Sequence, residues 1–310
     1  MGVVWLTLLT NTKYLSGLLT LDFSLKAVGS KYPLVALYTD GLTPNGHAAL
    51  DARGIKKQRI EYLLPKAEND YSNDVRFYDC WSELPAAGVG ELRANTELSG
   101  KLQPFSLIEY ERVVMLDSDM LVMKNMDELM DLPLDITGDR IFAGAHACVC
   151  NPLKREHYPK DWIPENCGYT SQHGDPAAAA EKGAPPTFGL GIVNGGLQVV
   201  NPSMDLYDRI QKTINSPDKT TNYAFADQSL LSDTFYGKWV PLSYKYNALK
   251  TLRRCHAPIW KDEEVKNIHY ILSPKPWDKR ESDDPTHAWW WESNDKRHKE
   301  EKEKGIADGW

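Results

Sequence analysis

Short apolar runs alternate along the chain with longer stretches in which apolar residues recur at helical spacing. The nearly continuous run Val3–Leu9 predicts a buried strand, and the stretch that follows it predicts a helix over Leu15–Val28. The same criteria predict strands over Leu34–Tyr38, Arg59–Leu64, Arg112–Leu116, Ile192–Val200 and Asn267–Leu272, and helices over Glu91–Glu109, from the N-cap Ser203 to Ile214, and over Asp227–Phe235. This alternation predicts an α/β fold with a mainly parallel central sheet flanked by helices.

Two segments depart from the alternation. Residues 151–186 are rich in Pro, Gly and Ala and show no sustained periodicity, which predicts a long surface insertion. Residues 281–310 are highly charged and contain Trp289–Trp291, which is typical of a solvated helix or a frayed tail. We therefore expect a single domain over residues 1–280 and a charged, Trp-containing C-terminal tail over 281–310.

Composition narrows the class of protein. With 42% hydrophobic and 25% charged residues, the 310-residue chain is unlike collagenous, disordered or membrane-spanning proteins. Its net charge of -7 argues against a partner that is bound by neutralising phosphates, so we expect no nucleic acid. The apolar start is too short to span a bilayer and lacks a signal-peptide pattern, and Leu6 stands where a myristoylation motif needs Ser or Thr. We expect a soluble cytoplasmic protein with no membrane span.

The cysteines give a weaker signal. There are five of them, an odd number without paired CxxC knuckles, which favours a reducing compartment. Cys148 and Cys150, together with His146, could belong to a zinc site. A C-x-C without a second cysteine pair is more often a pair of buried thiols on a strand, and this is the interpretation we favour.

Two carboxylates mark the first candidate site. Asp117 and Asp119 follow the apolar strand Arg112–Leu116 directly, and Met120–Val122 behind them is apolar again. The carboxyl end of a strand is where open α/β sheets bind ligands. Short acidic triplets are common as solvated turns, but carboxylates that interrupt a buried run need a partner, and a divalent cation is the natural one.

Several blocks of the sequence together resemble glycosyltransferase family eight, the family of glycogenin and galactinol synthase. The central block comprises Lys101–Leu107, Tyr110, Arg112–Asp119 and Asp127–Leu129. The other blocks, in family order, are Leu9-Thr10-Asn11 with Tyr14, then Asn194-Gly195-Gly196, then Ala226-Asp227-Gln228, and finally His269–Trp277, which is similar to an HxxGxxKPW signature. One departure is Leu272, which stands at the glycine of that signature, and another is Phe105, where glycogenin has Trp.

The resemblance implies a GT-A fold and a retaining hexosyltransferase that uses a UDP-sugar and a divalent cation, usually Mn²⁺. It implies that Asp117, Asp119 and His269 bind the metal and that Lys275 faces the diphosphate. A metal that bridges the two phosphates, helped by a lysine, would neutralise the charge that develops on the leaving group. Mixed oxygen and nitrogen ligands suit Mn²⁺ better than Ca²⁺.

The resemblance also assigns the remaining donor contacts. The nucleotide would be held by Leu9, Thr10, Asn11, Tyr14, Arg93, Lys101, Ser118 and Leu272, with the Tyr14 ring stacked on uracil, and the donor sugar by Asn194, Gly196, Asp227 and Gln228. Asp227 would face the anomeric carbon, with Gln228 and Lys275 as its catalytic partners. The alternatives are local: Thr10 and Asn11 could cap a helix, and so could Asp227.

The sequence leaves the acceptor open between a small molecule, a glycan and a protein. Residues 151–186 would line the acceptor side or form a structural Ω-loop, and Trp289–Trp291 would be a sugar platform or, as we favour, an anchor for the tail. The alternative functions are a self-glycosylating primer, for which a tyrosine such as Tyr169 would be the acceptor, and an inactive sugar-nucleotide or glycan-binding module. UDP-glucose and UDP-galactose are the expected donors. Family members are often dimers, so a homodimer is compatible with the resemblance.

Overall fold

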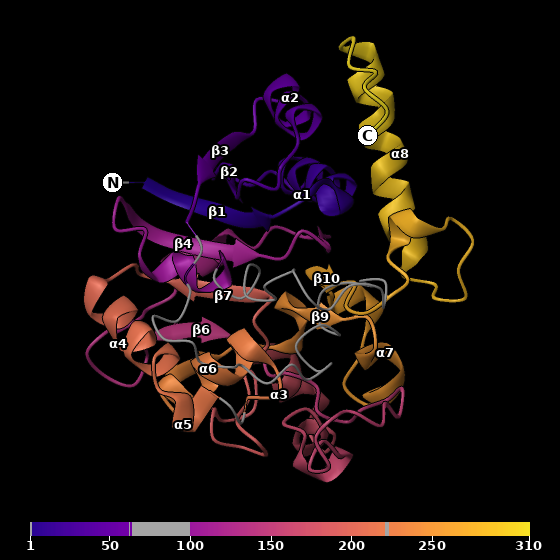
Figure 1. Ribbon diagram of the computed structural model, residues 1–310. Helices are drawn as coiled ribbons and strands as arrows, with labels where there is room; N and C mark the ends of the chain where they lie inside the picture. Colours follow the sequence, from indigo (N-terminus) through magenta and orange to yellow (C-terminus); the bar gives the residue numbers. More distant parts are fainter. Residues whose placement is uncertain (1, 62, 64–99, 221–222) are drawn as a thin grey trace.

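The computed structural model describes residues 2–61, 63, 100–220 and 223–310 (Figure 1). Arg93 and most of the first half of the expected helix Glu91–Glu109 lie outside the described residues. Among the described residues, no helix has the length and apolar character needed to cross a membrane.

A seven-stranded sheet forms the centre of the molecule, in the order β3-β2-β1-β4-β7-β6-β8. Only β7 runs antiparallel to its neighbours β4 and β6, and every other pair is parallel. The mainly parallel α/β fold expected from the sequence is therefore confirmed. The strands are β1 (Gly2–Leu9), β2 (Leu34–Tyr38), β3 (Lys56–Arg59), β4 (Tyr110–Leu116), β6 (Phe142–Gly144), β7 (Leu197–Val200) and β8 (Trp239–Pro241).

A smaller sheet of three strands, in the order β5-β10-β9, lies beside the central one. Its strands are β5 (Met120–Val122), β9 (Ala248–Leu249) and β10 (Asn267–His269). Because only three residues separate the end of β4 from the start of β5, this second sheet is tied to the carboxyl end of the central strand.

Helices cover both faces of the central sheet. Alternate residues of β1 point to opposite faces, as the strand period requires: Val4 and Leu6 pack with α4 and α6, whereas Trp5 packs with α1 and α2. The α-helices are α1 (Leu15–Ala27), α2 (Pro44–Ala52), α3 (Pro176–Glu181), α4 (Met204–Ile214), α5 (Pro217–Thr220), α6 (Ala226–Thr234), α7 (Leu252–Cys255) and α8 (His287–Glu303). Short 3₁₀ helices are η1 (Thr12–Tyr14), η3 (Gly100–Phe105), η4 (Asp127–Asp131), η5 (Pro164–Asn166), η6 (Thr170–Gln172), η7 (Tyr244–Tyr246), η8 (Asp262–Glu264) and η9 (Pro276–Asp278).

Several predicted boundaries were wrong. The strand expected over Arg59–Leu64 lies earlier, at β3, and the strand expected over Ile192–Val200 begins only at β7. In the described part of the expected helix Glu91–Glu109, η3 is a short 3₁₀ helix that contains Pro104, a residue that cannot donate the hydrogen bond an α-helix needs. The last strand ends at His269, three residues before the predicted end, and the Tyr270 N–H makes the last hydrogen bond of the ladder, to the Asp119 carbonyl.

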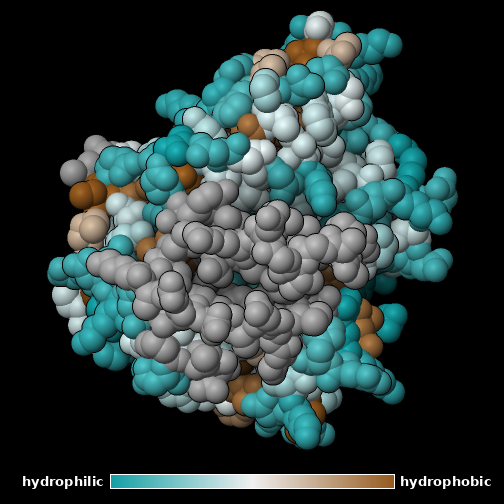
Figure 2. All heavy atoms as spheres, viewed as in Figure 1, coloured by the Kyte–Doolittle hydropathy of each residue, from teal (hydrophilic) through white to brown (hydrophobic). Residues whose placement is uncertain are grey.

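The C-terminal segment forms the long helix α8, which lies against α1 (Figure 1). Trp290 and Arg297 on α8 are each only 1% exposed, and the Thr20 hydroxyl of α1 donates to Asn294 at 2.9 Å. On the face shown in Figure 2, the described surface is mostly hydrophilic, with hydrophobic residues in small scattered groups. The charged residues of α8 thus surround a buried contact with the body of the protein.

Candidate active site

The two sheets meet at the candidate site. β4 ends at Leu116, Asp117 and Asp119 follow, and β5 begins at Met120. His269 pairs with Met120 across the antiparallel β10–β5 ladder, which places its side chain beside both carboxylates. The Asp117 N–H donates to the Gly196 carbonyl at 2.9 Å, so the chain just before β7 closes the site from the other side.

Asp117, Asp119 and His269 form a compact group of potential metal ligands. One ligand atom from each lies within 4.8 Å of the others, and His269 Nε2 is 3.2 Å from Asp119 Oδ1 and 3.5 Å from Asp117 Oδ2. All three side chains are buried. Two buried carboxylates and an imidazole nitrogen fit a divalent cation of the Mn²⁺ or Mg²⁺ class, because hard oxygen donors and one nitrogen are the ligands such ions take.

Two hydrogen-bonded asparagine side chains fix the orientation of the His269 ring. Its Nδ1 lies 2.8 Å from Asn247 Oδ1, while Asn247 Nδ2 donates to Asn194 Oδ1 at 2.8 Å. Since the Asn247 oxygen can only accept, Nδ1 carries a proton, and Nε2 is the nitrogen that faces the two carboxylates. Sequence reasoning missed Asn247; it is a fully buried polar residue just before β9, and only its place in the fold reveals its role.

Two buried lysines accompany the carboxylates. Lys101 Nζ donates to Asp117 Oδ2 and Lys275 Nζ to Asp119 Oδ2, each at 2.6 Å, and Lys275 Nζ also donates to the Tyr270 carbonyl at 2.8 Å. Burial disfavours the charge on Asp119, but Lys275 and His269 together hold the pKa of that carboxyl well below its usual range. Asp119 is therefore kept ionised and ready to accept a cation.

Asp227 and Gln228 lie at the start of α6, next to the Asn194-Gly195-Gly196 turn. Gln228 Oε1 accepts from Asn194 Nδ2 at 2.9 Å and from the Gly195 N–H at 3.3 Å. Asp227 is 4% exposed, its Oδ2 has no hydrogen-bond partner among the described residues, and burial raises the pKa of its carboxyl. The N-cap residue of α6 is Phe225, and Asp227 is the second residue of the helix, so the N-cap interpretation fails for it.

Gly195 and Gly196 in this turn have no room for a side chain. A Cβ on Gly195 would overlap the Asp227 carboxylate, and a Cβ on Gly196 would overlap the His269 ring. The close packing of this turn thus sets the distance between Asp227 and the Asp117, Asp119 and His269 group.

Several residues that were expected to contact the nucleotide line a cavity next to Asp117 and Asp119. This small cavity is lined by Leu8, Thr10, Asn11, Tyr14, Lys101, Asp117, Ser118 and Asp119. Asn11 Oδ1 accepts from the Lys13 N–H at 2.9 Å and therefore caps η1, as the local alternative had it. The Ser118 hydroxyl donates to the Leu8 carbonyl at 2.7 Å, and the Leu9 side chain is buried in the core, so neither of these two side chains points freely into the cavity.

A larger cleft connects Asp117, Asp119 and His269 with Asp227 and the insertion. It is lined by Tyr14, Lys101, Asp117, Asp119, Ala147, Cys148, Pro152, Tyr158, Trp162, Asn194, Gly195, Gly196, Phe225, Asp227, Gln228, Leu249, Thr251, His269, Ile271, Leu272 and Lys275. The insertion contributes an aromatic wall, in which the Trp162 ring stacks on Phe225 with centroids 4.3 Å apart. Tyr169, by contrast, is fully buried and donates its hydroxyl to the His146 carbonyl, so it offers no accessible acceptor oxygen.

Leu272 keeps the backbone conformation that its place in the signature requires. Its φ is +63°, in the left-handed region where glycine is the usual residue. The departure from the HxxGxxKPW pattern therefore changes the side chain that lines the cleft but leaves the turn of the backbone intact.

Comparison with known proteins gives the family. The family model described as Glycosyl transferase family 8 matches residues 6–281. Galactinol synthase 1 from Ajuga reptans is 26% identical over 272 residues, which are 86% of this chain and 71% of that protein. An uncharacterized protein, R707, of Acanthamoeba polyphaga mimivirus is 24% identical over 277 residues, which are 88% of this chain and 81% of that protein.

Solved structures show the same fold. The galactosyltransferase LgtC, in complex with donor and acceptor sugar analogs, matches with a TM-score of 0.57 at 17% identity, over 96% of each chain. The glycosyltransferase GlyE of Streptococcus pneumoniae TIGR4 matches with a TM-score of 0.58 at 16% identity, over 98% of this chain but only 64% of its own. The GT-A fold and the hexosyltransferase class expected from the sequence are thereby confirmed, and the chain belongs to glycosyl transferase family 8.

Proposed function

We propose that this protein transfers a hexose from a UDP-sugar to an acceptor, with retention of configuration and with a divalent cation, Mn²⁺ in the first place. The observation that carries the proposal is the convergence of Asp117, Asp119 and His269 within 4.8 Å at the carboxyl end of β4, inside a cleft that also contains Asp227. Metal ligands beside a lone buried carboxylate are what the transfer of a sugar from a diphosphate needs.

Each group would have a separate task. Asp117, Asp119 and His269 would hold the cation, which when bound neutralises the charge on the leaving diphosphate. Lys275 and Lys101 would offer their N–H groups to phosphate oxygens in exchange for part of their present contacts with the carboxylates. Tyr14, whose ring lies 5.6 Å from Lys275 Nζ, would cover the base.

Asp227 would act at the anomeric carbon. Retention follows if Asp227 attacks that carbon while the bond to UDP breaks and the acceptor oxygen later replaces the carboxylate. It also follows if the acceptor attacks from the side of the leaving group, its proton passing to the departing phosphate, with Asp227 stabilising the positive charge on the sugar. The unpartnered Oδ2 of Asp227 supports a role in either route.

The first experiment measures UDP release from UDP-galactose, UDP-glucose and UDP-N-acetylglucosamine, with and without Mn²⁺, because slow donor hydrolysis needs no known acceptor. A galactinol synthase and a galactosyltransferase among the relatives place UDP-galactose first. We expect release that requires Mn²⁺, favours one sugar and is abolished by Asp119→Asn. Asp139→Asn, on an exposed part of the chain, is the matched control and should release UDP like the wild type.

Two results would contradict the proposal. Release that persists without any divalent cation and in Asp119→Asn would remove the metal from the reaction. Binding of UDP without release, even with a broad panel of small-molecule, glycan and peptide acceptors, would point to a sugar-nucleotide-binding module instead.

A further inference from the structure

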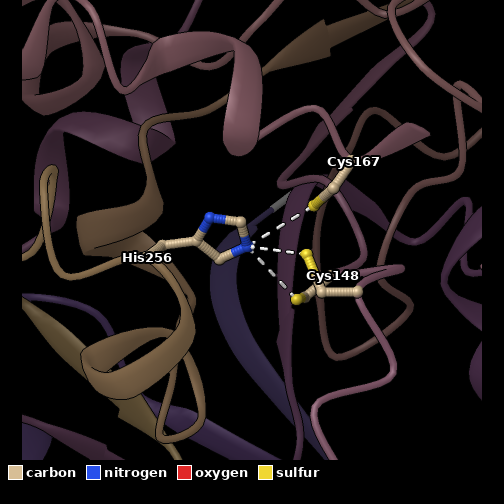
Figure 3. A group of neighbouring side chains, drawn as sticks. Cys148, Cys167 and His256 are labelled. Atoms are coloured by element: carbon tan, nitrogen blue, oxygen red, sulfur yellow. Dashed lines mark hydrogen bonds between the residues drawn. The ribbon is translucent and has the colours of Figure 1, made fainter. Parts of the chain in front are cut away.

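A second group of metal-binding side chains lies outside the Asp117, Asp119 and His269 site. Cys148, Cys150, Cys167 and His256 bring one sulfur or nitrogen atom each to within 4.8 Å of one another. Figure 3 shows the His256 ring directed at the sulfur atoms of Cys148 and Cys167. The distances from His256 Nε2 are 3.2 Å to Cys150 Sγ, 3.4 Å to Cys148 Sγ and 3.5 Å to Cys167 Sγ.

These distances are those of a tetrahedral ligand shell. With the Zn–S and Zn–N bond lengths usual in proteins, the nitrogen and each sulfur of a tetrahedral site are about 3.6 Å apart. The three observed separations fall slightly short of that edge length, so an ion at the centre would require only small outward shifts. Three thiols around one imidazole nitrogen make the Cys₃His set that is common in structural zinc sites.

The second ring nitrogen of His256, Nδ1, has a hydrogen-bond partner, as the non-ligating nitrogen of a metal-binding histidine usually does. His256 Nδ1 lies 2.9 Å from His173 Nε2. If His256 donates the Nδ1 proton to His173, its Nε2 lone pair points at the three sulfur atoms, and a ligating histidine is usually held in this way by an acceptor behind it. His173 comes from the insertion, whereas Cys148 and Cys150 lie in the segment that follows β6.

The surroundings favour a closed, structural site. His256 and Cys167 are 0% and 1% exposed, and all four ligands come from the protein, which leaves no position for a reacting molecule. Cys255 lies next to this group but is not one of the four ligands. Its Sγ is 3.8 Å from Cys148 Sγ, and its thiol donates a hydrogen bond to the Thr251 carbonyl at 3.1 Å. None of the thiols in the described residues forms a disulfide.

We infer that Cys148, Cys150, Cys167 and His256 bind one structural Zn²⁺ ion. Thiolate and imidazole ligands select Zn²⁺ over Mn²⁺, so the two metal sites of the chain would take different ions. Binding displaces the thiol protons to solvent and forms three Zn–S bonds and one Zn–N bond. The inference does not depend on the proposed transfer reaction.

The ion would join three segments that are distant in the sequence. Cys148 and Cys150 follow β6, Cys167 lies in the insertion 151–186, and His256 follows α7 directly. Cys148 also lines the large cleft, together with Thr251 just before α7. The zinc would therefore hold the insertion and α7 as one wall of the cleft, opposite Asp117 and Asp119.

The test measures zinc bound to the full chain, purified with a reductant that does not bind metals. An Asp119→Asn background removes the acidic site as a source of bound metal. We expect one tightly held zinc per chain, and after its removal a Co²⁺ titration should give the sulfur-to-metal charge-transfer absorption and tetrahedral d–d bands of a thiolate site. A chain that holds no zinc, as purified or after Zn²⁺ is added back, would overturn the inference, as would a Co²⁺ spectrum without sulfur bands.

Variants identify the ligands. Cys167→Ser and His256→Ala should lose the zinc, whereas Cys255→Ser should keep it; zinc loss in Cys255→Ser would overturn the ligand set. His173→Ala, which removes only the acceptor behind the ring, should weaken Zn²⁺ binding about 10- to 100-fold in competition with a chromophoric chelator. An unchanged affinity in His173→Ala and in His256→Ala together would show that the imidazole is no ligand.

Discussion

His269 Nδ1 lies 2.8 Å from Asn247 Oδ1, and the amide of Asn247 is itself held by Asn194, whose own amide donates to Gln228. One row of hydrogen-bonded side chains thus runs from His269 to Gln228, the residue beside Asp227. The row fixes the orientation of the His269 ring and couples the Asp117, Asp119 and His269 group to Asp227.

Removing the middle of this row should weaken the metal site. In Asn247→Ala the His269 ring loses the acceptor for its Nδ1 proton, so Nε2 no longer faces the carboxylates in a single tautomer. We expect the Mn²⁺ concentration for half-maximal UDP release to rise about 10- to 100-fold. Asn215→Ala, in the turn that ends α4, is the control and should keep the wild-type value. An unchanged Mn²⁺ requirement in Asn247→Ala would show that Asn247 only fills space.

A methyl group at Gly196 should disable the site without unfolding the protein. The added Cβ would overlap His269 and crowd Asn194 Oδ1, and these are rigidly held groups that can move only by giving up their hydrogen bonds. We expect Gly196→Ala to lose at least about a hundredfold in UDP release, the scale that misplacement of a catalytic group by about 1 Å produces. Gly174→Ala, where a Cβ meets nothing within 4 Å, is the matched control. Wild-type activity in Gly196→Ala would mean that His269 is no ligand.

Asp227 should show a conflict between activity and stability. Its carboxyl is buried, its Oδ2 has no partner, and burial raises its pKa, so folding becomes less favourable as the pH rises from the unfolded pKa through the folded one. Asp227→Asn removes this cost. We expect a free energy of unfolding at neutral pH equal to or above that of the wild type, measured by urea denaturation, with UDP release reduced at least about a hundredfold. A variant that is both destabilised and active would contradict the assignment.

The difference between what the sequence predicted and what it missed follows from the range of the interactions. β1 and β4 are long apolar runs with both faces buried, so their pattern alone located them. β3 reads Lys-Lys-Gln-Arg at the edge of the sheet and was missed, because hydrogen bonds to β2, not burial, hold it there. The three-residue strands β6 and β8 are too short to show any period.

The candidate site residues show the same difference between local patterns and long-range contacts. The carboxylate pair is local and was found, whereas Asn247 acts only through a contact across 22 positions in the sequence. The sequence placed Cys148 and Cys150 beside His146, whereas the structure places them beside His256 and Cys167. The His146 ring instead lies against Trp239, and its Nε2 bonds to the Ala184 carbonyl. No spacing rule joins residues 148, 167 and 256, so only the fold brings them together.

The contact between α8 and the body of the protein should depend on pH. Arg53, at the end of α2, makes two hydrogen bonds to Glu301 at 2.7 Å each, and its side chain is 5% exposed. Burial disfavours the charge on Glu301, but Arg53 and Arg297 hold the pKa of its carboxyl below the usual value. The stabilisation is therefore complete above the unfolded pKa and is lost as the pH falls through the folded one.

Glu301→Gln should lower the free energy of unfolding at neutral pH by about 2 to 3 kcal/mol, since it weakens hydrogen bonds to a charged group that is mostly buried. The difference from the wild type should shrink in acid. Lys296→Ala, which breaks only the exposed pair with Glu292, should change stability by less than about 0.5 kcal/mol. Urea denaturation at neutral and acid pH measures both. Equal, small effects of the two variants would show that α8 is held by its apolar face alone.

Leu272 tests whether the backbone or the side chain matters at the signature glycine position. Its φ of +63° costs a non-glycine residue about 1 to 2 kcal/mol in the folded state, and Leu272→Gly would remove that cost. A glycine also increases the conformational entropy of the unfolded chain, which lowers the free energy of unfolding by about 0.4 to 1 kcal/mol. We therefore expect nearly unchanged stability. Without the Leu272 side chain, the cleft wall next to Lys275 would open and the backbone N–H of residue 272 could approach the diphosphate. Leu272→Gly should therefore bind UDP with Mn²⁺ more tightly than the wild type does, as measured by calorimetric titration. Leu272→Ala keeps the strained backbone and removes most of the bulk; if it tightens binding as much as Leu272→Gly does, the side chain alone is the obstacle, and close backbone approach is not what the glycine provides.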